Sequence, residues 1–116
     1  MKQFIYLSTC DTCKKIMSEL DLSQFEVREI KSNPLKEEEI NQLKELAGSY
    51  EDLFSKRAQL YKKLGLKDQN LTEEDFKKYL LEHYTFLKRP VVVNGDEIYI
   101  GSSPKTKALL KEKWGK

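Results

Sequence analysis

Two cysteines separated by two residues, Cys10 and Cys13, carry the chemistry that this sequence offers most clearly. They follow a short apolar segment, residues 4–7, and residues 11–21 then repeat apolar side chains at the three- and four-residue spacing of a helix. The N-terminus of a helix has unpaired backbone N–H groups and the positive end of the helix dipole, so it favours an anion. A thiolate is such an anion and is the nucleophilic form of cysteine. The pattern therefore indicates a redox-active or nucleophilic cysteine pair.

Other roles for the cysteine pair fit the sequence less well. Structural zinc needs four ligands, whereas this pair supplies two and His83 is the only histidine. We therefore expect no metal site. A disulfide across two residues would constrain almost nothing, and we expect no secretory leader. Inert buried cysteines remain an alternative, above all for Cys13, which falls on the apolar face of its helix.

Composition narrows the class of protein. The 116 residues are 39% hydrophobic and 34% charged, which suits one domain with a highly charged surface. Basic residues number 21 and acidic residues 19, and the net charge of +2 gives no case for a direct nucleic-acid partner. Because no apolar run approaches the roughly 18 residues of a membrane span, we expect no membrane partner. Two cysteines without an export signal predict a cytoplasmic protein.

The pattern of apolar residues and turn signals predicts the elements that hold the cysteine pair. The first two strands should be parallel because a helix connects them, and the last two should be antiparallel because Asn94-Gly95 predicts a tight turn. The fold class is therefore α/β, with a mixed four-stranded sheet in the order β-α-β…β-β-α. The expected elements are strands over 4–7, 24–30, 91–94 and 97–100, a helix over 11–21, a helical block over 31–88, and a final helix that Ser103-Pro104 begins.

The helical block contains its own start and stop signals. Asn33 as N-cap and Pro34 at the first helical position predict a helix that begins there and ends at a glycine, Gly48. A second helix is expected over 53–64, with Gly65 ending it. A third should begin at Thr72, which has an acidic residue three positions later in a variant of the capping box.

Several short motifs occur in an order and spacing that resemble a known family. The motifs are Thr-Cys-Asp-Thr-Cys-Lys-Lys at 9–15, Asn-Pro-Leu at 33–35, Arg57 with Tyr-Lys-Lys-Leu-Gly-Leu at 61–66, Leu-Lys-Arg-Pro-Val-Val-Val at 87–93, and Ile-Gly at 100–101. On these motifs the chain resembles the arsenate reductase (ArsC) family, in particular its Spx-like and YffB-like branch, over essentially its whole length. The resemblance implies a thioredoxin-like fold within a single domain, 1–116, with a core of residues 1–30 and 89–116 and a helical insertion of residues 31–88.

The resemblance also assigns roles to individual residues. It implies that Cys10 is the nucleophile, with Cys13 as a second catalytic cysteine. It places Arg89 beside Cys10 and a cis peptide bond before Pro90. Arg89 suits this position because a guanidinium is always charged and presents a planar fork of donors to an oxyanion or thiolate. The residues expected to bind substrate are Thr9, Thr12, Arg57 and Pro90.

The sequence also departs from the arsenate reductase pattern. Arsenate reductases of this family surround the cysteine with three arginines. Here the first of these positions falls at Ser55, with Arg57 two residues later, and no arginine occurs near Ser102, where the third is expected. Lys105 and Lys107 are close in sequence but are not equivalent to an arginine at a bidentate site, although Lys105 could compensate in part. The second cysteine agrees with Spx-like members. These departures argue against arsenate reduction itself.

Two classes of function therefore remain open. In the first, the protein is a thiol-dependent oxidoreductase in which Cys10 attacks an oxidised thiol or an oxyanion. Cys13, glutathione or a glutaredoxin-like partner then resolves the adduct, and no cofactor is bound. In the second, the protein is an Spx-like redox-sensing regulator, in which a Cys10–Cys13 disulfide changes a surface that binds RNA polymerase.

Overall fold

The computed structural model of the chain describes residues 2–116. It divides into two units, one formed by residues up to 34 together with 89–116 and the other by residues 35–88. That the two units make up one domain stays a prediction. Within residues 2–116, no helix is both long enough and apolar enough to span a membrane. The elements of the first unit are β1 (Lys2–Tyr6), α1 (Asp11–Glu19), β2 (Glu26–Glu29), β3 (Val91–Asn94), β4 (Glu97–Ile100) and α5 (Pro104–Trp114).

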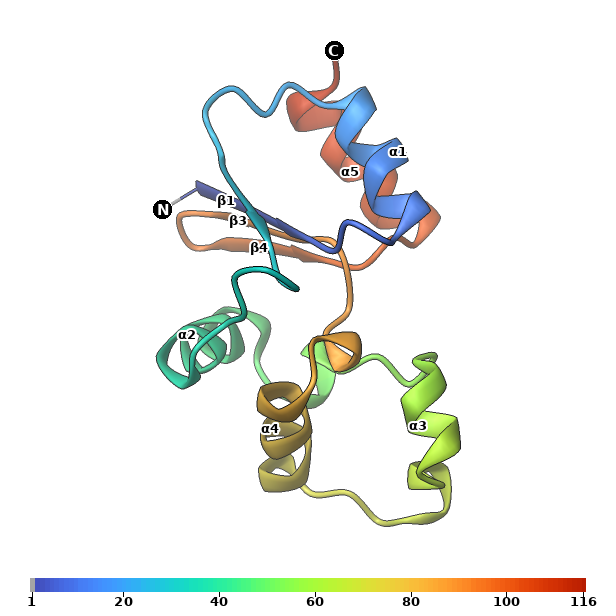
Figure 1. Cartoon of the computed structure of the whole chain (residues 1–116). Helices are drawn as coiled ribbons and strands as arrows, with labels where there is room; N and C mark the ends of the chain where they lie inside the picture. The colour runs from blue at the N-terminus through green and yellow to red at the C-terminus, as the bar shows by residue number, and fades with distance from the viewer. Residues whose placement is uncertain (1) are drawn as a thin grey trace. The chain divides into compact units, whose positions relative to one another are not determined.

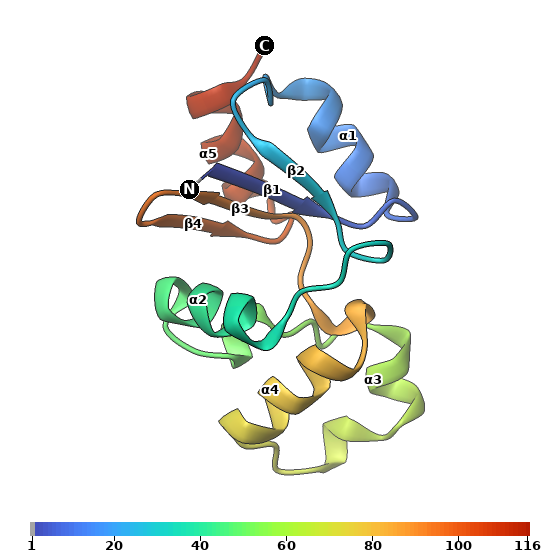
Figure 2. The ribbon, with the colours of Figure 1, turned by 60° about the vertical axis from the view of Figure 1, so that its left-hand side comes forward.

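The sheet of the first unit has the strand order β2-β1-β3-β4 (Figure 2). β1 pairs in parallel with β2 and antiparallel with β3, and β3 pairs antiparallel with β4. The register places Phe4 of β1 between Val27 of β2 and Val92 of β3. The mixed four-stranded sheet and all of its predicted strand directions are thereby confirmed.

Helices α1 and α5 lie side by side on one face of the sheet (Figure 1). They bury an apolar cluster against it, and this burial is the main stabilising contribution to such a layer. Trp114 closes the layer, because its ring meets Phe25 edge-on at 5.1 Å and Tyr99 at 5.8 Å between ring centroids. The buried cluster consists of Phe4, Ile16, Leu20, Phe25, Val92 and Leu110.

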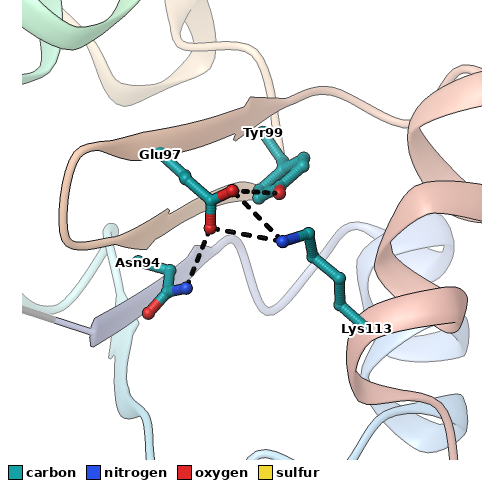
Figure 3. A network of polar contacts seen from close by, with 4 residues as sticks. All are labelled: Asn94, Glu97, Tyr99 and Lys113. Carbon is teal, nitrogen blue, oxygen red and sulfur yellow. Dashed lines mark hydrogen bonds and ion pairs between the residues drawn. The ribbon is translucent and has the colours of Figure 1, made fainter.

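The β3–β4 hairpin is joined to α5 by a polar network (Figure 3). Gly95 takes a φ of +61° in the two-residue turn, a conformation that favours glycine. The Glu97 carboxylate accepts hydrogen bonds from the Asn94 side-chain amide at 3.0 Å and the Tyr99 hydroxyl at 3.3 Å. It also accepts from the Lys113 ammonium of α5 at 3.1 Å. The charged pair of Glu97 and Lys113 is exposed, so the network orients the hairpin more than it stabilises the fold.

The second unit is built from short helices around an aromatic centre. The Phe54 ring stacks on Phe86 at 5.1 Å and packs against Phe76 at 4.9 Å. The short helices of this unit confirm the predicted helical character of the block. Its elements are α2 (Glu37–Ala47), η1 (Glu51–Leu53), α3 (Gln59–Lys63), η2 (Leu66–Asp68), α4 (Glu73–Glu82) and η3 (Tyr84–Phe86), where η marks a 3₁₀ turn.

The predicted start of the first helix in this block was wrong. Asn33 and Pro34 precede α2, whose N-cap is Lys36. The cause is Arg28, a buried arginine of β2 whose guanidinium donates to the Asn33 carbonyl at 3.0 Å and the Pro34 carbonyl at 2.7 Å. Because these carbonyls bind Arg28, the helix begins later, where the Lys36 N–H donates to the Glu39 carboxylate at 2.9 Å.

The prediction of a single helix over 53–64 was also wrong. Phe54 forms a β-bridge with Leu87, and the Ser55 N–H donates to the Phe86 carbonyl at 2.6 Å. Backbone groups that a helix would pair internally are thus paired with a distant segment. Only α3, at Gln59–Lys63, remains helical.

Three other boundaries agree with the sequence. Gly48 and Gly65 end helical segments with φ of +102° and +66°. Thr72 begins α4, and its hydroxyl accepts from the Asp75 N–H at 3.3 Å while the Asp75 carboxylate accepts from the Thr72 N–H at 2.9 Å. His83 follows α4, and its Nδ1 accepts from the Thr85 N–H at 3.1 Å, which is a structural role.

Two adjacent leucines of α5 test the packing of this helix against the sheet of the first unit. Leu110 is 1% exposed and Leu109 is 37% exposed. Leu110→Ala should lower the free energy of unfolding by about 2–5 kcal/mol, because it leaves a cavity between helix and sheet. Leu109→Ala, the matched control, should cost less than about 1 kcal/mol. Urea denaturation of both variants measures the difference, and equal losses would contradict the orientation of α5.

Candidate active site

Cys10 lies where the chain passes from β1 into α1. β1 ends at Tyr6, and the Cys10 N–H then donates to the Leu7 carbonyl at 3.0 Å, which closes a turn. Cys10 is the N-cap of α1, and its Sγ accepts a hydrogen bond from the Cys13 N–H at 3.4 Å. A cysteine sulfur thus occupies the position that a serine or aspartate oxygen usually takes at a helix start. This confirms the position predicted from sequence.

The surroundings of the Cys10 sulfur favour its thiolate. Partial burial raises the pKa of Cys10, but hydrogen bonds to the sulfur from the Cys13 side chain and backbone act in the opposite direction. The Arg89 guanidinium adds another hydrogen bond and a positive charge, and the net effect lowers the pKa of Cys10 below its ordinary value. Cys10 therefore reaches its reactive form at a lower pH than an ordinary cysteine does.

Cys13 is shifted in the opposite direction. Its side chain is fully buried on the inner face of α1. Burial, together with the hydrogen bond that its thiol shares with Cys10, raises the pKa of Cys13 to about 12. Two identical thiols thereby acquire different pKa values, lowered for Cys10 and raised for Cys13, in the way that paired acids at active sites are separated.

The segment that carries Arg89 approaches the cysteines from the start of β3. The peptide bond between Arg89 and Pro90 is cis, which confirms the prediction. The Pro90 carbonyl accepts from the Gly101 N–H at 2.8 Å. This bond places Gly101, and Ser102 after it, at the same end of the sheet as Pro90, next to the start of α5.

The structure thus brings together Cys10, Cys13 and Arg89, and their catalytic roles stay predictions. Thr9 and Thr12 are exposed on either side of Cys10 in the chain. Arg57 belongs to the second unit, where it is exposed in the turn before α3. Within the part of the chain that the structure describes, no group of three or more His, Cys, Asp or Glu side chains is arranged to hold a metal ion.

Sequence analysis missed a carboxylate beside the Cys10 turn. Glu29, the last residue of β2, accepts a hydrogen bond from the Ser8 N–H at 2.9 Å. The strand over 24–30 was predicted from its alternating pattern, which indicates which residues share a face of the sheet. Such a pattern carries no signal for a side chain that binds the backbone of the turn after the neighbouring strand.

Arg89→Lys tests the contact between Arg89 and the sulfur. Lysine keeps the positive charge but loses the fork of donors, so the variant should raise the pKa of Cys10. Losing one hydrogen bond of about 1 kcal/mol corresponds to roughly 0.7 pH unit. The pH dependence of Cys10 alkylation measures the shift, and a circular dichroism spectrum checks the fold. An unchanged midpoint would show that Arg89 does not stabilise the thiolate.

A pair of substitutions at Cys13 tests the second donor. Cys13→Ala removes the side-chain donor and should raise the pKa of Cys10, whereas Cys13→Ser keeps a hydroxyl donor and should raise it less. Both variants keep the backbone N–H that bonds to the Cys10 sulfur. Thiolate absorbance followed from pH 4 to 11 gives both midpoints. Identical midpoints for alanine and serine would rule out a hydrogen bond from the Cys13 side chain.

Comparison with known proteins agrees with this arrangement. Residues 6–108 match the sequence profile of the ArsC family. An arsenate reductase of Haemophilus influenzae is 30% identical over 76 residues, which cover 61% of this chain and 66% of that protein, just under two thirds of its length. The global transcriptional regulator Spx of Bacillus subtilis is 25% identical over 80% of this chain and 73% of its own.

A solved structure shows the same fold. An ArsC-family-related protein from Bacteroides fragilis superposes with a TM-score of 0.76 at 26% identity, covering 95% of this chain and 98% of its own. The mixed four-stranded sheet with its helices is accordingly a thioredoxin-like α/β fold. With its profile match covering most of the sequence, this chain belongs to the ArsC family.

Proposed function

We propose that this protein is a thiol-dependent oxidoreductase of the cytoplasm that uses Cys10 as its nucleophile on an oxidised thiol. The observation that carries the proposal is the sulfur of Cys10 at the start of α1, with its pKa lowered by donors from Cys13 and Arg89. A thiolate in such a position attacks electrophilic sulfur and leaves readily when it is attacked in turn.

The reaction on a disulfide proceeds in two exchanges. The Cys10 thiolate attacks one sulfur of the substrate, forms a mixed disulfide and releases the other sulfur as a thiolate, which takes up a proton. The Cys13 thiol then loses its proton and attacks the Cys10 sulfur. The Cys10–Cys13 disulfide forms and the second substrate thiol leaves. The substrate disulfide is reduced to two thiols, and the protein dithiol is oxidised by the same two electrons.

The negative charge on Cys10 disappears once its sulfur is in a mixed disulfide. The thiolate of Cys10 is one cause of the raised pKa of Cys13, so this contribution is lost at the step in which Cys13 must act. Two glutathione thiols, or the dithiol of a glutaredoxin, then reduce the Cys10–Cys13 disulfide and are oxidised in turn. This reductant is diffusible, so the proposal requires no bound cofactor.

Reduction of a mixed disulfide tests the proposal. The substrate is a peptide disulfide with glutathione, and the assay couples glutathione reductase to NADPH oxidation. We expect turnover with the wild type, none with Cys10→Ser, and altered turnover with Cys13→Ser. Turnover that survives Cys10→Ser would contradict the assignment of the nucleophile.

An oxyanion such as arsenate is the other candidate substrate, and we expect weak or no arsenate reduction. No arginine occurs near Ser102, and losing one charge-assisted contact there should cost about 1.5–3 kcal/mol. That corresponds to roughly a tenfold to hundredfold loss of affinity. Ser102→Arg should therefore raise glutaredoxin-coupled arsenate turnover, with Ala108→Arg at an exposed position of α5 as the control. Efficient turnover by the wild type would contradict this expectation.

A second candidate function is that of a redox-sensing regulator that binds RNA polymerase. The similarity to the regulator Spx over 80% of this chain, with both cysteines present, favours it. In this case the Cys10–Cys13 disulfide is the signal and the protein has no substrate. Binding of the oxidised protein, the reduced protein and Cys13→Ser to purified bacterial RNA polymerase distinguishes the two functions. Stable binding by the oxidised form alone, without turnover in the disulfide assay, would favour the regulator.

A further inference from the structure

We propose that Glu29 is a positioning residue for the Cys10 thiol, because its carboxylate holds the turn that presents the Cys10 sulfur to Cys13 and Arg89. This inference rests on the proposed function, in which Cys10 is the nucleophile. It adds a part of the site that lies outside the Cys-x-x-Cys motif and the Arg-Pro segment.

The first part of the argument is the bond between the strand and the turn. Glu29 ends β2 and pairs with Tyr6, which ends β1. One carboxylate oxygen of Glu29, Oε2, accepts from the Ser8 N–H at 2.9 Å. Ser8 lies within the turn that the hydrogen bond from Cys10 to Leu7 closes. A charge-assisted bond from the neighbouring strand therefore reaches the turn two residues before the reactive sulfur.

The carboxylate is itself held in place. Its other oxygen, Oε1, accepts from the Ser32 N–H at 2.8 Å and from the Ser32 hydroxyl at 2.7 Å. Glu29 thus joins two turns, the one that carries Cys10 and the one that follows β2. Its bonds to Ser8 and Ser32 lower the pKa of Glu29 to about 2, so the carboxylate stays ionised wherever Cys10 titrates.

Positioning matters here because the Cys10 thiolate depends on aligned donors. A hydrogen bond weakens steeply when donor and acceptor lose alignment. The Cys13 N–H donates to the Cys10 sulfur at 3.4 Å, so this bond depends on where the turn holds the sulfur. A looser turn would move the sulfur relative to both Cys13 and Arg89. The consequence is a higher pKa for Cys10 in a protein that remains folded.

The direction in which the pKa of Cys10 shifts distinguishes a positioning role of Glu29 from an effect of its charge alone. Removing a negative charge near a thiolate lowers the pKa of that thiol, because repulsion is relieved. Losing alignment raises it, because the stabilising donors are lost. A substitution at Glu29 therefore gives a rise if the residue positions the turn and a fall if only its charge matters.

The experiment compares three variants of the full chain that keep both cysteines. Glu29→Ala removes both acceptor oxygens. Glu29→Gln leaves a single acceptor oxygen for the turn that carries Cys10 and the turn that follows β2. Glu26→Gln makes the same change of charge at the exposed first residue of the same strand and serves as the matched control. Iodoacetamide labelling from pH 4 to 10, with mass spectrometry to locate the label, gives the midpoint for Cys10 in each protein. Urea denaturation is measured in parallel.

We expect the midpoint of Cys10 to rise in the order wild type, Glu29→Gln, Glu29→Ala, with no change in Glu26→Gln. The alkylation rate at a pH below the wild-type midpoint should fall about three- to tenfold in Glu29→Ala, as expected for losing about one hydrogen bond to the sulfur. If Glu29→Ala fails to fold, the same rise in Glu29→Gln supports the proposal.

One result would overturn the inference, and a different one would overturn the proposed function. A midpoint that stays the same or falls in folded Glu29→Gln would show that Glu29 contributes only stability or charge. The proposed function has its own readout in the wild type: a Cys10 midpoint no lower than that of Cys13 would contradict the nucleophile itself. The failure of one claim is therefore distinguishable from the failure of the other.

Discussion

The hydrogen bonds to the sulfur of Cys10 are the interaction on which this site depends. They come from the first turn of α1, through the Cys13 N–H and side chain, and from Arg89 before β3. An anion that is half removed from water needs such donors, because burial alone raises the pKa of a thiol. The hydrogen bonds lower the pKa of Cys10 by more than burial raises it only while the two segments that carry the donors keep their positions relative to the sulfur.

The first unit supplies that position through its central strand. β1 pairs with β2 on one side and with β3 on the other, so the end of β1 lies between the end of β2 and the start of β3. Cys10 follows β1, Arg89 precedes β3 and Glu29 ends β2. The three side chains are separated by long stretches of sequence, yet the pairing of three strands brings them to one end of the sheet. Burial of the cluster around Phe4 against α1 and α5 holds the strands and helices together.

Much of this arrangement could be predicted from the sequence because it depends on local signals. The spacing of apolar residues predicted the order of the strands, and the connecting helix and the Asn94-Gly95 turn predicted their directions. The strand-to-helix transition placed Cys10 just before the first helical turn. Ser103 and Thr72 began their helices as predicted, because an N-cap bonds to residues only three positions away. The cis bond before Pro90 followed from resemblance to a family and not from the residues themselves.

The errors have a common physical cause, which is competition from groups outside the helical pattern of the segment itself. Asn33 and Pro34 carry good helix-start signals, but their carbonyls bind the buried Arg28. Phe54 lies in a helical pattern, but its segment pairs with Leu87 and its ring fills the centre of the second unit. No local rule reports such partners. Glu29 was missed for the same reason, since its bond to Ser8 joins the end of β2 to the turn that follows β1.

The most direct test of the account identifies which sulfur is the anion in the unmodified protein. Carbon-13 NMR of cysteine-labelled wild type follows the Cβ resonances of Cys10 and Cys13 from pH 4 to 11, with Cys10→Ser used only to assign them. The account predicts that Cys10 titrates first, below the ordinary range of a thiol, and that Cys13 stays protonated until well above it. Titration of Cys13 before Cys10, or of both together near the ordinary cysteine pKa of about 8.5, would contradict it.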